Sequence, residues 1–331
     1  MTGMMRAAWF AGAGGPEVIE LRDVPRPAPG AGEVLVRVAA AGLNRADLVQ
    51  RRGAYPAPAG WPSEIPGLEY AGTVESVGPG VTRWRAGDRV MGLVGGGGMA
   101  EALVVHEAEA MAVPAQLALT DAAAIPEAFL TAYDALVHRA RLVRGERVLL
   151  HAAASGVGTA AVQLCRRLGL HAVGTSRSAD KLARLAALGL EEAIDTSRSG
   201  FREQLREPVD AIIDVLGGPA LADNLAVLRP RGRLVLLGFL LGSRTEADLG
   251  VVLRHRLEII GSAMRSRGLA ERVPLVAEFV AQVLPGFAPS ADGTPPALVP
   301  VVDQVLPMSE LGAAHRLMER NETFGKLVLR W

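Results

Sequence analysis

The residues between His151 and Gly158 have the types and spacing needed to bind a phosphate group. They read His-Ala-Ala-Ala-Ser-Gly-Val-Gly and lie between an apolar strand pattern and a helix pattern that stops at Gly169. Backbone N–H groups in such a turn approach a pyrophosphate closely, and the helix N-terminus adds about half a positive charge. The binding residues predicted here are Ser155, Gly156, Val157 and Gly158.

This turn departs from the usual dinucleotide fingerprint, G-x-G-x-x-G. Its three glycine positions hold Ala153, Ser155 and Gly158, so only the last one matches. A tight strand–helix turn that needs small residues for packing alone is therefore the alternative interpretation.

The next predicted strand, 171–176, ends where such folds choose their cofactor. An acidic residue at this place binds the ribose of NAD, whereas basic residues accommodate the phosphate of NADP. Ser176 and Arg177 stand here, and Lys181 follows one helical turn later, so the three could hold a dianionic phosphate. The pattern favours NADPH over NADH, and a solvated helix start is the alternative.

The elements that must position these residues follow a simple order. From Glu146 onward, strand and helix patterns alternate through six strands, which predicts a doubly wound parallel α/β sheet. Before Thr120, short strands separated by Gly and Pro predict a compact β-rich domain. We expect this domain to comprise 1–124 and 266–331, with the nucleotide-binding domain at 125–265.

Composition excludes several other classes of protein. The chain has 331 residues with 35 basic and 35 acidic side chains, so no net field attracts nucleic acid or anionic lipid. The longest strongly apolar stretch, 234–242, is far shorter than the roughly 20 residues of a membrane span. The N-terminal apolar run is interrupted by Gly, Pro and Glu, so we expect no signal peptide and a cytoplasmic protein. The single cysteine, Cys165, rules out an intramolecular disulfide and any zinc site with two thiolates.

An ordered set of motifs resembles the medium-chain dehydrogenase/reductase superfamily over nearly the whole chain. Within it, the chain is similar to the zinc-free NADPH:quinone oxidoreductases that include zeta-crystallin, and most similar to their p53-inducible subgroup. The motifs are GLNRADL (42–48), RRGAYPAP (51–58), PGLEYAGTVESVG (66–78), AGDRV (86–90), AAAIPEAFLTAYDAL (122–136), AAASGVGTAAVQL (152–164), DVLGG (214–218), AMRSRG (263–268) and GKLVL (325–329). The resemblance implies a GroES-like β-rich catalytic domain beside a six-stranded Rossmann domain.

Two zinc-ligand positions of the zinc-dependent relatives are changed. Asn44 stands where those relatives have Cys, and Leu68 stands where they have His. The resemblance therefore implies a site with no metal. A quinone or enone delocalises incoming electrons and needs no Lewis acid, whereas an alcohol substrate would be difficult without one.

The resemblance also implies three catalytic residues. Asn44 is expected to face nicotinamide and substrate and to donate to a carbonyl oxygen. Asp47 orients its neighbours or caps a helix. Tyr55 lines the substrate site and donates a hydrogen bond or a proton, with a packed loop tyrosine as the alternative.

The resemblance implies cofactor contacts at five places in the chain. Thr131 matches a cofactor-contacting residue at a helix start, with a cap as the alternative, and two groups follow the fifth and sixth strands. Thr196 replaces a tyrosine that helps many relatives to hold the 2′-phosphate. Ordinary packing is the alternative for the two strand-end groups in the complete set, which is Asn44, Thr131, Gly238, Phe239, Leu240, Ser262, Met264, Asn321 and Lys326.

The function expected from these features is NADPH:quinone oxidoreductase activity of the EC 1.6.5 type. Hydride, or single electrons, would pass from the nicotinamide to a quinone, and a homodimer is expected. An NADPH-dependent enone, alkenal or enoyl reductase is the second hypothesis, and a cofactor-binding protein without enzymatic activity is the third. The glycine run at 95–98 lacks the Lys-Ser/Thr of a phosphate loop, and we expect it to be a flexible hairpin near the substrate.

Overall fold

The computed structural model describes residues 3–290 and 292–331. The chain divides into two compact units, the first made of residues 1–130 and 265–331 and the second of residues 131–264. The chain leaves the first unit inside helix α3 (Pro126–Tyr133), six residues after the expected boundary at 124. It returns at Arg265, one residue before the expected second segment.

The second unit is built on one parallel sheet of six strands. The strand order is β10-β9-β8-β11-β12-β13, so the chain moves outward from β8 in one direction and from β11 in the other. This order confirms the predicted doubly wound sheet. The strands are β8 (Arg147–Leu150), β9 (His171–Ser176), β10 (Glu192–Asp195), β11 (Val209–Asp214), β12 (Leu228–Leu236) and β13 (Glu258–Gly261).

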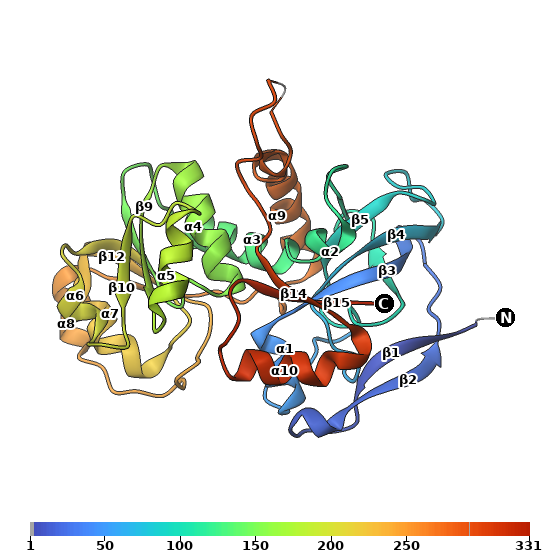
Figure 1. Cartoon of the computed structure of the whole chain (residues 1–331), viewed down its shortest axis with the longest axis horizontal. Coiled ribbons are helices and arrows are strands. Elements are labelled where there is room, and N and C mark those ends of the chain that lie inside the picture. The colour runs from blue at the N-terminus through green and yellow to red at the C-terminus, as the bar shows by residue number, and fades with distance from the viewer. Residues whose placement is uncertain (1–2, 291) are drawn as a thin grey trace. The chain divides into compact units, whose positions relative to one another are not determined.

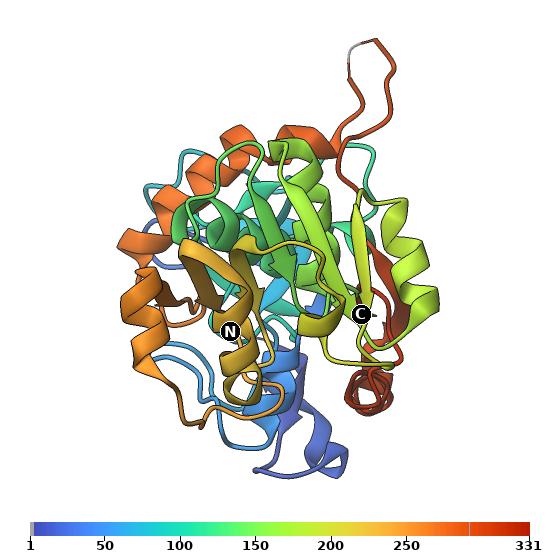
Figure 2. The same ribbon diagram turned by 90° about the vertical axis from the view of Figure 1, so that its left-hand side faces the viewer.

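Helices cover both faces of this sheet. Right-handed crossovers place α4 and α5 on the face opposite to α7 and α8, and Figures 1 and 2 show these helices flanking the strands. Buried aliphatic residues such as Leu149, Ile212 and Leu234 fill the core between the sheet and its helices. The helices are the π-helix η2 (Asp134–Arg139), α4 (Gly156–Leu168), α5 (Ala179–Ala186), α6 (Phe201–Gln204), η3 (Gly218–Ala220), α7 (Leu221–Val227) and α8 (Leu249–His255).

The first unit is rich in β-structure, as its period-two apolar pattern predicts. Val34, Val36 and Val38 all point into one buried cluster. The main sheet has the order β14-β15-β3-β4-β5-β7, with β6 also paired to β3, and β1 and β2 form a separate antiparallel pair. The strands are β1 (Met4–Phe10), β2 (Ile19–Pro25), β3 (Glu33–Leu43), β4 (Glu69–Val77), β5 (Arg89–Leu93), β6 (Ala102–His106), β7 (Met111–Ala112), β14 (Val302–Pro307) and β15 (Lys326–Arg330).

The C-terminal strand completes this unit and matters for its chemistry. β15 pairs antiparallel with β3 so that Leu327 lies opposite Leu43, which brings Lys326 beside Asn44. The remaining elements are η1 (Pro16–Val18), α1 (Arg45–Arg51), α2 (Leu119–Ala122), α9 (Leu269–Gln282), η4 (Leu284–Phe287), η5 (Met308–Glu310) and α10 (Leu311–Glu319). Among the helices within the described residues, none has the length and apolar character required to cross a membrane.

Candidate active site

Lys326, Asn44 and Glu69 form a closed polar cluster in the first unit. The Lys326 ammonium donates to the Leu43 carbonyl at 2.8 Å and to Asn44 Oδ1 at 2.6 Å, and it pairs with Glu69 Oε1 at 2.5 Å. Asn44 Nδ2 donates to the same Glu69 oxygen at 2.9 Å and to the Gly42 carbonyl at 3.3 Å. All three ammonium hydrogens and both amide hydrogens therefore have acceptors inside the protein.

This cluster changes how two predicted residues can act. Lys326 is 4% exposed and has no hydrogen left for a cofactor, although it was predicted to bind one. Asn44, predicted to donate to a substrate carbonyl, already gives both amide hydrogens to protein oxygens. A side chain at Gly42 would place its Cβ 2.2 Å from Glu69 Oε1, so glycine is required there for the cluster to close.

Asp47 has its polar contacts in the backbone around it. Its Oδ2 accepts the Asn44 N–H at 2.8 Å, and its Oδ1 accepts the Gly67 N–H at 3.1 Å. Burial raises the pKa of Asp47 to about 6, against the opposing effects of these two hydrogen bonds and of Lys326 and Arg265. The contacts suit a residue that caps α1 and orients its neighbours.

Tyr55 differs from these residues because its hydroxyl is available to bind a substrate. The ring is half-buried in the loop after α1, and Arg265 Nη1 donates to the Tyr55 backbone carbonyl at 3.0 Å. Among the described residues, the structure records no hydrogen bond to the Tyr55 hydroxyl. Burial raises the pKa of Tyr55, Glu127 raises it further, and Arg265 opposes this change.

The glycine run at 95–98 is buried, so the expectation of a flexible hairpin is wrong. A Cβ at Gly95 would lie 2.4 Å from Cδ1 of Trp61, and one at Gly98 would lie 2.8 Å from the Glu69 carbonyl oxygen. These glycines allow close packing between segments, which restricts their motion.

The predicted phosphate turn lies in the second unit between β8 and α4. Ser155 is the N-cap of α4, and its hydroxyl accepts the Gly158 N–H at 3.1 Å. A Cβ at Gly158 would lie 2.4 Å from the Ala153 carbonyl oxygen, so this position requires glycine for close packing of the helix against the turn. The N–H groups of Gly156 and Val157 belong to the first turn of a 13-residue helix, where an anion is stabilised.

The connection from β9 to α5 presents the predicted basic residues without a carboxylate at the strand end. Ser176 ends β9, and its hydroxyl accepts the Ser178 N–H at 3.2 Å. Ser178 caps α5 by accepting the Lys181 N–H at 3.4 Å, which places Lys181 in the first turn. Arg177 is exposed and Lys181 is half-buried, as a site for a charged ligand requires.

The predicted contacts after β12 and β13 lie at the carboxyl edge of the sheet. Leu240 donates its N–H to Val215 at 2.9 Å, and Phe239 beside it is 53% exposed. Ser262 follows β13, and its hydroxyl donates to Asp134 at 3.0 Å. The other members of these two groups are Gly238, which is half-buried, and Met264, which is buried.

Two other residues predicted to contact the cofactor, Thr131 and Asn321, belong to α3 and to the turn after α10. Thr131 is the sixth residue of α3, so it does not begin or cap a helix as expected. Asn321 is exposed in the turn after α10 in the first unit, where its Oδ1 accepts from Arg45 at 2.7 Å.

His151 is a buried structural link in the second unit. Its Nδ1 lies 3.1 Å from Thr175 Oγ1 and its Nε2 lies 2.7 Å from Asn224 Oδ1, so it joins the end of β8 to β9 and α7. Burial lowers the pKa of His151, which keeps the ring neutral. Burial of the Asp214 carboxyl raises the pKa of Asp214. This carboxyl accepts the Leu216 N–H at 2.7 Å.

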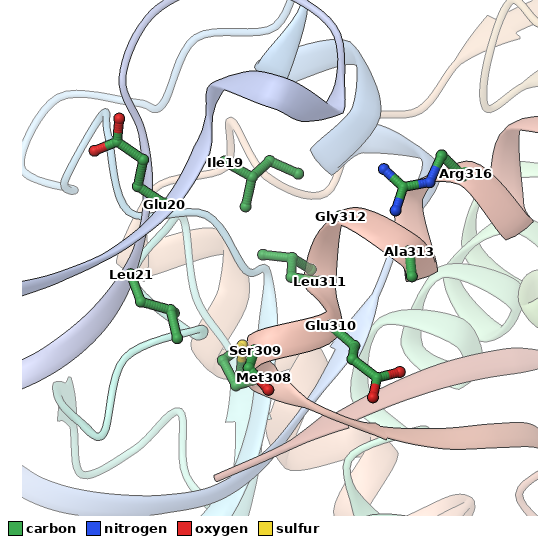
Figure 3. A pocket seen from close by; sticks show the side chains of 10 residues that line it. All are labelled: Ile19, Glu20, Leu21, Met308, Ser309, Glu310, Leu311, Gly312, Ala313 and Arg316. Carbon is green, nitrogen blue, oxygen red and sulfur yellow. The ribbon is translucent and has the colours of Figure 1, made fainter.

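A pocket of about 280 Å³ in the first unit lies between β2 and α10 (Figure 3). Ile19, Leu21 and Leu311 supply its apolar wall, and Glu20 and Arg316 are among its charged residues. None of the residues predicted for substrate or cofactor lines this pocket, so it is separate from the groups above.

Sequence reasoning missed Glu69, Gln50 and Arg265. Glu69 is fully buried at the start of β4, and its charge beside the apolar Leu68 is the signal that could have identified it. Arg265 and Gln50 come together only through tertiary folding, which no local pattern reveals.

Comparison with known proteins identifies the class. The family model described as "Alcohol dehydrogenase GroES-like domain" matches residues 30–115, and the one described as "Zinc-binding dehydrogenase" matches residues 156–282. A quinone oxidoreductase of Pseudomonas aeruginosa is 40% identical over 256 residues, which cover 75% of this chain and 78% of that protein. The "Synaptic vesicle membrane protein VAT-1 homolog" of Rattus norvegicus is 32% identical over 349 aligned positions, covering 98% of this chain and 84% of that protein.

A solved structure agrees with these relatives. The quinone oxidoreductase of Pseudomonas syringae pv. Tomato DC3000 matches with a TM-score of 0.86 and 30% identity, covering 99% of this chain and 100% of that one. Fold and sequence together define a GroES-like domain joined to a Rossmann domain, in an oxidoreductase of the class that uses a nicotinamide cofactor. The chain belongs to the medium-chain dehydrogenase/reductase superfamily and is quinone oxidoreductase-like.

The name of one matching family raises the question of zinc, and the side chains at the two positions where zinc-dependent relatives are expected to have Cys and His do not suit it. Asn44 offers an amide that is bonded to Lys326 and Glu69, and Leu68 is a buried apolar residue. An ammonium already neutralises the Glu69 carboxylate at 2.5 Å. Zinc prefers thiolate, imidazole or free carboxylate ligands, and the described residues contain no group of three or more His, Cys, Asp or Glu that could hold a metal ion.

Proposed function

We propose that this protein is an NADPH-dependent quinone reductase in which the Tyr55 hydroxyl donates a hydrogen bond or a proton to the substrate oxygen. Three side chains were expected to act on the substrate, and two of them, Asn44 and Asp47, are bonded within the protein. The Tyr55 hydroxyl makes no hydrogen bond among the described residues, and Tyr55 as a residue is half-buried. This available phenol is the observation that carries the proposal.

The chemistry of Tyr55 suits a donor to a developing oxyanion. Burial raises the pKa of its phenol, so the hydroxyl keeps its proton at neutral pH. A quinone that accepts a hydride gains negative charge on oxygen, and a positioned O–H group stabilises that charge or transfers its proton. When bound, the nicotinamide supplies the hydride.

The second unit has residues that fit NADPH. The first-turn amides of Gly156 and Val157 suit the pyrophosphate, because a helix N-terminus stabilises an anion. Arg177, Lys181 and the Ser176 hydroxyl suit the 2′-phosphate, since charge-assisted bonds to phosphate are among the stronger hydrogen bonds. The absence of an acidic residue at the end of β9, within the described chain, favours NADPH over NADH.

Quinones are preferred to alcohols as substrates on chemical grounds. A quinone delocalises the added electrons over its ring, so it needs a hydrogen-bond donor and no Lewis acid. The cluster around Lys326 and Glu69 has no ligand set for a metal that would polarise an alcohol.

The proposal is tested by NADPH oxidation with a panel of quinones and enones of graded size. We expect the highest kcat/KM with a quinone, and no loss of activity after dialysis against a metal chelator. A higher kcat/KM with an enone than with every quinone would instead favour a reductase of unsaturated carbonyls. NADPH binding without oxidation by any acceptor would favour a protein with no enzymatic activity.

A further inference from the structure

Arg265 is buried, and its guanidinium reaches three segments of the first unit. Its Nε donates to the Gly95 carbonyl at 2.7 Å, its Nη1 to the Tyr55 carbonyl at 3.0 Å, and its Nη2 to Gln50 Oε1 at 2.8 Å. Gln50 lies in α1, Tyr55 in the loop after it, and Gly95 in the buried glycine turn. A single side chain therefore ties these three segments together.

The same guanidinium also packs on the Tyr55 ring. Its Cζ lies 5.0 Å from the ring centroid, within the range of a cation–π contact. Arg265 therefore holds both the backbone and the aromatic ring of Tyr55, while the hydroxyl is left available.

Arg272 makes a comparable contact on the same loop but with a different ring. Its Cζ lies 5.8 Å from the Trp61 ring, its Nε pairs with Glu109, and its Nη1 donates to the Arg267 carbonyl at 2.6 Å. These contacts go to groups other than Tyr55. Arg272 is therefore a matched control: a largely buried arginine, stacked on an aromatic residue of the same loop, without contact to the proposed donor.

We propose that Arg265 is the positioning residue of Tyr55, fixing the loop and the phenol ring in the orientation from which the hydroxyl donates to the substrate oxygen. The inference rests on the proposed function of Tyr55. The planar fork of an arginine is required for this role, because three acceptors from separate segments are bonded by three different nitrogens. A lysine has one nitrogen and would keep the charge without this geometry.

The charged groups around Tyr55 predict how the variants differ. Glu127 of α3 raises the pKa of Tyr55, and Arg265 lowers it. Asp47 of α1 faces Arg265 and favours its charged form. Removing the cation with Arg265→Met should therefore shift the ionisation of Tyr55 to higher pH, whereas Arg265→Lys retains the charge and should shift it less.

The first measurement follows phenolate formation by ultraviolet difference absorbance in the intact protein without substrate. The chain has three tyrosines, and subtracting the titration of Tyr55→Phe isolates the contribution of Tyr55. We expect Arg265→Met to raise the midpoint by about one pH unit and Arg272→Met to leave it unchanged. Equal midpoints in wild type and Arg265→Met would overturn the inference.

The second measurement is a double-mutant cycle on kcat with NADPH and a quinone. We expect Arg265→Met and Arg265→Lys each to lower kcat by about tenfold in the wild-type background, and each by less than about twofold when Tyr55 is already Phe. Arg272→Met should have the same effect in both backgrounds. Equal effects of Arg265→Lys in the two backgrounds would show a purely structural role and overturn the inference.

The two proposals fail in different ways. A normal kcat in Tyr55→Phe would contradict the proposed function, while the titration would still report whether Arg265 holds the phenol. All four tryptophans, Trp9, Trp61, Trp84 and Trp331, lie in the first unit, so their fluorescence verifies that each variant is folded there. Arg265→Lys keeps the cycle informative if Arg265→Met does not fold.

Discussion

At the scale of single residues, the first unit holds buried charges that balance one another. Lys326 and Glu69 pair at 2.5 Å, and each is almost wholly buried. A buried ion pair of this kind is costly to break from one side, because the remaining charge has no partner. Lysine suits this place because three acceptors surround a single nitrogen, whereas a planar guanidinium would not fit that arrangement.

Asp47 makes the stability of the folded protein depend on pH. Its pKa in the folded protein is raised to about 6 from 3.8, so folding favours the protonated carboxyl. The stabilisation from this group is fully present below pH 3.8 and is lost as the pH rises through about 6. Between pH 5 and pH 7.5, wild type should therefore lose roughly 1–2 kcal/mol of stability relative to Asp47→Asn.

Urea unfolding followed by tryptophan fluorescence measures this difference, because the fluorescence reports on the first unit. Asp292→Asn is the control, since a backbone hydrogen bond from Thr294 lowers the pKa of that exposed first-unit carboxyl, so its difference from wild type should stay constant between pH 5 and pH 7.5. A difference between wild type and Asp47→Asn that stays constant with pH would contradict this account of Asp47.

At the scale of elements, we propose that the connection from β9 to α5 selects NADPH over NADH. Arg177→Ala combined with Lys181→Ala should raise the KM for NADPH by about 10- to 100-fold, since each residue loses a charge-assisted contact to phosphate. The KM for NADH should change little. Arg202→Ala removes another exposed arginine of the same unit, paired with Asp223 at 3.4 Å, and should affect neither cofactor. Equal effects of the double variant on both cofactors would contradict the assignment.

The elements also show how far the sequence could predict the structure. The β9 and α4 ranges followed from apolar periodicity and from the glycines at the two ends of the helix, Gly158 and Gly169, which are local signals. The glycine run at 95–98 looked flexible in isolation and is buried, because Trp61 and Glu69 pack against it from distant parts of the chain. Whether Asn44 Oδ1 accepts a hydrogen bond within the protein likewise depends on Lys326 of β15, 282 residues away.

At the scale of the whole molecule, we propose that two copies associate through strand β13. This strand is an edge of the six-stranded sheet, and Ile259 on it is 42% exposed. The neighbouring helix α8 leaves Leu249 and Leu253 at 70% and 79% exposure. An open edge with apolar neighbours is a surface that a second copy can cover by strand pairing.

Sedimentation velocity tests this association. Wild type should sediment as a dimer at micromolar concentration, and Ile259→Lys combined with Leu253→Glu should sediment as a monomer. Val305→Lys is the control, because Val305 is 40% exposed on β14, an edge strand of the other sheet. A monomeric wild type, or a double variant that remains dimeric, would contradict association through β13.

The role of Tyr55 is tested most directly by the kcat of Tyr55→Phe with saturating NADPH and a quinone. The substitution removes one hydroxyl and leaves the ring beneath Arg265, so the loop should keep its position. We predict a fall in kcat of about 100-fold, the size expected for a lost proton donor, with an unchanged KM for NADPH. A kcat equal to that of wild type would show that another group donates the hydrogen bond or proton to the substrate oxygen.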